Sequence, residues 1–135
     1  MSRSGYTDDC DNLNLYRGTV ERAINGKRGQ SFLRELAAEL DAMLEKRLIQ
    51  SELIAENGEV CAIGSVCKAR NLDVKDVDVY DAGQVGDLVG ISRSMAAEIE
   101  FENDEGNWVG NETPEQRWIR MRKWVEMQIK NKGEQ

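Results

Sequence analysis

One amphipathic segment constrains the fold more than any other feature of this sequence. From Ser31 to Ile49, apolar residues recur every three or four positions and form a broad stripe along one side of a helix. The charged residues of the segment fall mostly off that stripe. Since an apolar face of this width has to be covered by other elements, we expect this helix to anchor the core, with Leu36 and Leu40 largely buried.

Shorter segments with helical spacing lie on both sides of this anchor. The pattern predicts helices over about 12–25, about 62–71, a glycine-containing stretch after Asp81, Ser92–Asn103, and Thr113 to about Asn131. The last of these begins with the sequence Thr-Pro-Glu-Gln, a capping box with proline at the first helical position. The stretch 72–80 alternates Val with Asp and is expected to be an extended connection or a weak strand.

The dipeptide Asn57-Gly58 lies between two short apolar stretches and predicts a β-hairpin. Both central residues of a type I′ turn need positive φ, which Asn and Gly adopt most readily. The predicted fold is therefore mainly α (α+β): a helical core of four to five helices with one short β-hairpin, in a single domain over 1–135.

Composition excludes several classes of chemistry. The chain has no His, which removes Ser-His-Asp and Cys-His catalysis and His-ligated zinc. Its three cysteines, Cys10, Cys61 and Cys67, form no C-x-x-C pair, so we expect reduced thiols rather than a zinc site or disulfides. We therefore expect no enzyme activity, no cofactor and no metal site.

The charge of the chain is unevenly distributed. The net charge is −7, with a strongly acidic middle over 61–112 and a basic segment over 113–135. No apolar run is long enough to span a membrane, and the first residues lack a secretory signal, so a cytoplasmic location in a bacterial cell is expected. The negative net charge opposes strong nonspecific binding to nucleic acid, whereas the basic segment over 113–135 favours an acidic partner.

The basic C-terminal helix is the main candidate binding site. At 100° per residue, Arg117, Arg120 and Trp124 cluster on one side, and we expect them to face outward with Lys123 as a partner-binding face. A second side, about 100° round the helix, is expected to face the core through Trp118, Met121 and Val125. The outward face could bind a partner or a second copy of the chain, and the acidic middle is an alternative binding face.

A second candidate is the basic turn Gly26–Gly29 before the anchoring helix. Lys27 and Arg28 would lie beside the free N–H groups of a helix start, which can hold a phosphate or a carboxylate. The spacing of a P-loop is absent, and a solvated turn between two helices explains the same residues.

Five segments together resemble small accessory proteins encoded by tailed bacteriophages and prophages. The segments are GYTDD at 5–9, YRG at 16–18, GKRGQSFLREL at 26–36, EVCAIG at 59–64 and ETPEQRW at 112–118. Leu44 stands where the family pattern has a Pro, so the anchoring helix is expected to continue through it. The resemblance implies a phage accessory protein and carries over no established activity.

These observations lead to one main functional hypothesis and two alternatives. The main hypothesis is a phage-encoded, non-enzymatic interaction protein that binds and modulates a host protein or host defence complex. The first alternative is a nucleic-acid-associated protein that uses the Arg/Trp helix. The second is a small metal- or nucleotide-dependent enzyme built on the carboxylates of the acidic middle.

Overall fold

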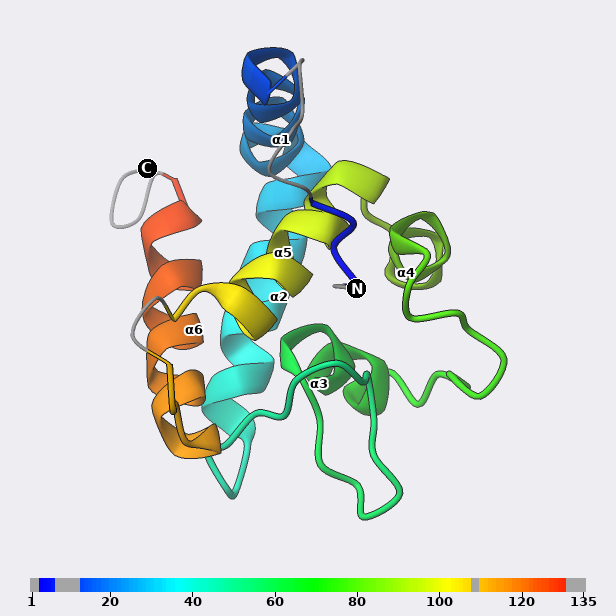
Figure 1. The fold of residues 1–135 in the computed structure, drawn as a ribbon, viewed down its shortest axis with the longest axis vertical. Helices are drawn as coiled ribbons and strands as arrows, with labels where there is room; N and C mark the ends of the chain where they lie inside the picture. The colour runs from blue at the N-terminus through cyan, green and yellow to red at the C-terminus, as the bar shows by residue number, and fades with distance from the viewer. Residues whose placement is uncertain (1–2, 7–12, 108–109, 131–135) are drawn as a thin grey trace.

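The computed structural model describes residues 3–6, 13–107 and 110–130, and within them the chain folds into six helices (Figure 1). In chain order they are α1 (Leu13–Asn25), α2 (Lys27–Ala42), α3 (Ala62–Ala69), α4 (Ala82–Val89), α5 (Arg93–Glu105) and α6 (Pro114–Gln128). The mainly helical fold is confirmed. Each of the six segments with helical spacing contains a helix, one more than the upper count of the predicted core of four to five helices. The described part contains no strand, so the α+β assignment was wrong there.

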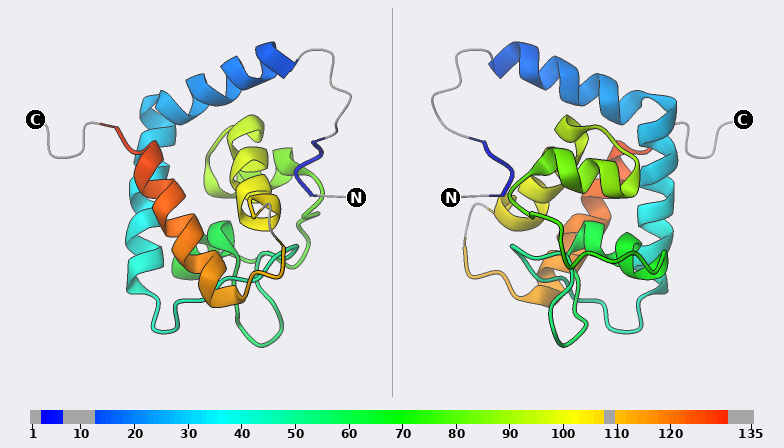
Figure 2. Two further views of the ribbon diagram at one scale, coloured as in Figure 1. Left: turned by 60° about the vertical axis from the view of Figure 1, so that its left-hand side comes forward. Right: turned by 90° about the vertical axis from the view of Figure 1, so that its right-hand side faces the viewer.

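Helix α2 forms the central support. Helix α1 meets it at Gly26 and runs across one end of the molecule, at a steep angle to α2 (Figure 2). Helices α3 and α6 pack against α2, while α5 packs against α1 and α4. Among the described residues, no helix is long and apolar enough to cross a membrane.

The apolar stripe of α2 lies in the core as predicted, with Leu33, Leu36 and Leu40 fully buried. The helix itself begins four residues earlier than expected and ends at Ala42, so the predicted extent of 31–49 was wrong. The chain turns after Ala42 and brings Leu48 back into the core, where its N–H donates to the Pro114 carbonyl over 3.1 Å. Tertiary contacts of the returning segment thus replace the last turns of the expected helix.

The helix starts predicted from side-chain caps are confirmed. Asp81 accepts hydrogen bonds from two backbone N–H groups at the start of α4, and Ser92 accepts one at the start of α5. Thr113 and Gln116 form both bonds of the capping box at the start of α6. Local sequence decides these positions because the capping side chain and the N–H groups it satisfies are neighbours.

The segment around Asn57-Gly58 makes a tight turn but not the predicted hairpin. It contains one isolated antiparallel bridge between Ile54 and Val60, and Gly58 alone has positive φ, so the type I′ assignment was wrong. The Gly58 N–H donates to the Ala55 carbonyl over 2.9 Å, as in a turn closed by a left-handed glycine. The strands are missing because the chain enters α3 directly after the bridge. The Val/Asp stretch over 72–80 also forms turns, with no strand.

Gly64 provides a test of this packing, with Gly18 as its matched control. Alanine normally stabilises a helix interior by about 0.5–1 kcal/mol over glycine. We expect Gly18→Ala to do so, since the one described neighbour near its Cβ position is the flexible end of Arg22. In α3, a Cβ on Gly64 would collide with the backbone carbonyl of Leu53. Gly64→Ala is therefore expected to lower the free energy of unfolding by about 1–3 kcal/mol. Urea denaturation measures both; a stabilising Gly64→Ala would contradict the packing described.

Candidate functional site

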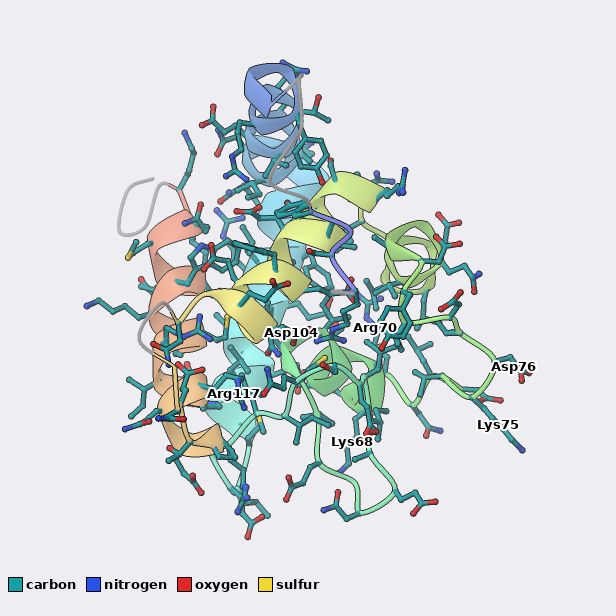
Figure 3. All side chains as sticks on the ribbon, viewed as in Figure 1. Lys68, Arg70, Lys75, Asp76, Asp104 and Arg117 are labelled. Atoms are coloured by element: carbon teal, nitrogen blue, oxygen red, sulfur yellow. The ribbon has the colours of Figure 1, made fainter. Side chains whose placement is uncertain are left out.

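The predicted outward direction of Arg117 was wrong. Its side chain is buried, with 6% exposure, and its Nη1 donates to the Leu48 carbonyl over 2.8 Å. Its Nε lies 3.3 Å from a carboxylate oxygen of Glu112. Figure 3 shows Arg117 directed from α6 toward the interior. The returning segment after α2 has carbonyl groups without helical partners, and Arg117 satisfies one of them.

Arg120 is half-buried rather than outward, so that part of the predicted face was also wrong. It forms a two-pronged ion pair with Glu112, with N–O distances of 2.6 and 3.0 Å. Its remaining donors reach the carbonyls of Glu102 and Asn103 at the end of α5. A helix end leaves carbonyl groups unpaired, and the Arg120 guanidinium satisfies two of them.

The other residues of α6 agree better with the predicted division into a core-facing side and an outward side. Met121 and Val125 are buried, and the half-buried Trp118 donates from its ring nitrogen to the Leu40 carbonyl of α2 over 3.1 Å. Lys123 is exposed and Trp124 is half-buried. Of the four predicted partner-binding residues, these two remain accessible to a partner.

Trp124 lines a polar cavity of about 390 Å³ between α1, α5 and α6. Glu98 of α5 lies in the wall of this cavity, and Arg17 of α1 donates to its two carboxylate oxygens over 2.7 and 3.2 Å. The Tyr6 hydroxyl donates to the same carboxylate over 2.7 Å. Burial and this hydrogen bond raise the pKa of Tyr6 well above its usual range, so the phenol keeps its proton and its role as donor.

Glu102, one turn beyond Glu98, also lines the cavity. Burial, followed by the nearby charge of Glu98, raises the pKa of Glu102 above its usual range. Arg17 and Lys130 contribute positive charge to the same cavity. The cavity therefore presents an indole ring with charges of both signs, a composition suited to binding polar side chains of a protein partner.

The predicted anion-binding residues lie elsewhere. Lys27 and Arg28 are exposed in the first turn of α2, so the expected basic turn is the start of the helix. With Arg22 and Ser92 they line a separate recess of about 230 Å³. No side chain from the described ranges caps the α2 N-terminus at Gly26, and anion binding there stays a prediction.

The structure brings together a buried ionic cluster that sequence reasoning missed. Arg3, with 2% exposure, donates to both oxygens of Asp104 over 2.6 and 2.9 Å. Its Nη1 lies 3.4 Å from Glu100 and 3.6 Å from the Cys61 sulfur. Figure 3 shows Asp104 at the centre of the molecule, near the end of α5. No local pattern could reveal a pair separated by about a hundred residues.

Glu100 is the member of this cluster whose polar atoms lack hydrogen-bond partners among the described residues. It is buried, with 1% exposure, and neither carboxylate oxygen receives a hydrogen bond within the described part of the chain. Burial raises the pKa of Glu100 to about 7; the charge of Arg3 opposes the shift, and that of Asp104 adds to it. Near neutral pH this carboxylate is therefore partly protonated.

Two of the three cysteines lie within the described residues. Cys61 and Cys67 are buried free thiols, and burial raises the pKa of Cys67 to about 12. Cys10 lies outside the described residues. Within the described ranges, no group of three or more potential metal-ligating side chains comes together.

Comparisons with known proteins give no independent assignment: no family model matches the chain, and neither does any curated protein or solved structure.

Glu100 makes the stability of the protein depend on pH. Its folded pKa of about 7 lies above its ordinary value of 4.5, so the folded state holds the proton more tightly than the unfolded state. Its contribution to stability is complete below about pH 4.5 and is lost as pH rises through 7. We expect Glu100→Gln, which imitates the protonated form, to be on the order of 1–3 kcal/mol more stable than the wild type at pH 8.

The two proteins should differ little at pH 5, because Glu100 is then protonated in the folded wild type. Urea denaturation at both pH values measures the difference. A Glu100→Gln variant that is less stable than the wild type at pH 8 would show that ionised Glu100 is needed as a partner for Arg3.

Proposed function

We propose that this protein is a non-enzymatic interaction protein that binds a protein of a bacterial host and modulates it, with the Trp124 cavity as the contact site. The observation that carries the proposal is the half-buried indole of Trp124 beside charged groups of both signs. Tryptophan contributes strongly to binding where a partner covers it and excludes water. The resemblance to phage accessory proteins supports a host protein as the partner.

The proposed site differs from the basic face expected from sequence. Arg117 and Arg120 satisfy groups of the protein itself and are poorly placed to pair with a partner. Trp124 is the residue of the predicted face that lines the cavity, and Arg17 of α1 and Glu102 of α5 line it as well. A partner with polar and charged side chains around an apolar contact would fit this arrangement.

The alternative of a nucleic-acid-associated protein has less support. It needs several accessible cations to neutralise phosphates. On α6, Arg122 is held by Asp41 at 2.8 Å and by Glu126 at 3.0 Å, in addition to the internal pairing of Arg117 and Arg120. Recovery of nucleic acid alone with the protein would nevertheless favour that alternative.

Substitution of Trp124 tests the proposal. We expect tagged wild-type protein to capture one host protein in stoichiometric amount from bacterial lysate, identified by mass spectrometry. Trp124→Ala should lower that capture by about tenfold or more, the effect of a hot-spot residue. Ile119→Ala removes an exposed apolar side chain elsewhere on α6 and serves as the matched control.

Thermal melts of both variants must first show an intact fold. Equal capture by Trp124→Ala and the wild type would contradict the proposed site. Loss of capture in both variants would show a general effect of α6 rather than a role for the cavity.

A further inference from the structure

The dipeptide Asn-Gly occurs twice in the chain, at Asn25-Gly26 and at Asn57-Gly58. This dipeptide is especially prone to loss of the asparagine side-chain amide, because glycine has no side chain that keeps its backbone nitrogen away from the preceding residue. Both asparagines are exposed, so water reaches both of them. Local sequence therefore treats the two sites alike, and the structure distinguishes them.

The side chain of Asn57 is folded back over the backbone of its own turn. Its Oδ1 accepts a hydrogen bond from the Glu59 N–H over 3.0 Å, as in an Asx-turn. When a nucleophile adds to the side-chain carbonyl carbon of an asparagine, negative charge develops on Oδ1. A backbone N–H that already points at this oxygen stabilises the developing charge.

A positive charge lies at the same turn. Lys68 is exposed on α3, and its ammonium donates to the Gly58 carbonyl over 2.9 Å (Figure 3). A cation this close favours loss of the Gly58 N–H proton, the step that makes the nitrogen nucleophilic. The same N–H donates to the Ala55 carbonyl over 2.9 Å. That bond closes a single turn outside the helices, so opening it disturbs no helix.

The dipeptide Asn25-Gly26 lies in a more restrained setting, because α1 ends at Asn25 and α2 begins directly after Gly26. The Gly26 N–H donates to the Arg22 carbonyl over 3.0 Å, and the Gly26 carbonyl accepts from the Gln30 N–H over 2.9 Å. Hydrogen bonds of both helices therefore hold this peptide. Within the described ranges, no donor approaches the side chain of Asn25 as Glu59 approaches that of Asn57.

We propose that the fold makes Asn57 a site of spontaneous deamidation and protects Asn25 from the same reaction. The Gly58 nitrogen gives its proton to hydroxide and attacks Cγ of Asn57, which forms a new C–N bond. The bond from Cγ to Nδ2 then breaks, and the nitrogen takes a proton from water and leaves as ammonia. Water opens the resulting cyclic imide at either carbonyl. The products are aspartate and isoaspartate, with one water consumed for each ammonia released.

Both products place a new carboxylate at the turn, beside the Lys68 ammonium. In the isoaspartyl product the backbone also passes through the β-carbon of residue 57. The modification thus changes the charge and the backbone of this turn over time, without an enzyme.

Peptide mapping by mass spectrometry measures both sites in one sample of the folded protein, incubated in mildly alkaline buffer. We expect deamidation at Asn57 to be faster than at Asn25 by about tenfold or more. In concentrated urea, which removes the fold, the two rates should lie within about threefold of each other. Equal rates in the folded protein, or a faster reaction at Asn25, would overturn the proposal. A difference that persists unchanged in urea would also overturn it, since local sequence would then be the cause.

A charge-removing variant tests the contribution of the ammonium. Lys68→Met should lower the rate at Asn57 by about two- to fivefold and leave the rate at Asn25 and the thermal melt unchanged. Lys75→Met removes the same charge from an exposed position in the loop after α3, and it should leave both rates unchanged. Deamidation of Asn57 at the wild-type rate in Lys68→Met, or an equal decrease in Lys75→Met, would overturn the role assigned to Lys68.

Discussion

The last turn of α5 is the point on which the arrangement of the other elements depends. Asn103 donates to the Ile49 carbonyl over 2.9 Å and accepts from the Ala62 N–H over 3.0 Å, which joins the irregular chain after α2 to the start of α3. The neighbouring Asp104 holds Arg3 of the N-terminal segment. A buried amide and a buried carboxylate stabilise the fold only when their hydrogen bonds are made, so these contacts require one specific arrangement of distant segments.

The same requirement explains why the basic helix is less available for binding than its sequence indicates. Arg120 extends from α6 to the carbonyls at the end of α5, and Arg117 reaches the carbonyl of Leu48. Both also pair with Glu112. These arginines connect α6 to the end of α5 and to the chain after α2, so the accessible part of the predicted binding face is reduced to Lys123 and Trp124.

Sequence reasoning succeeded where the controlling interaction is local. The starts of α4, α5 and α6 were predicted correctly, and Leu36 and Leu40 are buried as their spacing required. It failed where distant groups compete for the same backbone. The expected helix through Leu44 ends at Ala42, and the expected hairpin is reduced to one bridge. The candidate site was predicted only in part, since Trp124 is accessible but its neighbours in the cavity come from α1 and α5.

The sequence by itself determined a mainly helical chain, the caps of its helices and the apolar face of α2, because each follows from residues within a few positions of one another. Only the tertiary structure decided the direction of Arg117, the ionic cluster of Arg3 with Asp104, and the exposure of Leu44. The position of an arginine along a helix does not determine where its guanidinium points. The guanidinium pairs with carbonyls and carboxylates that folding brings near it, and those lie tens of residues away in the chain.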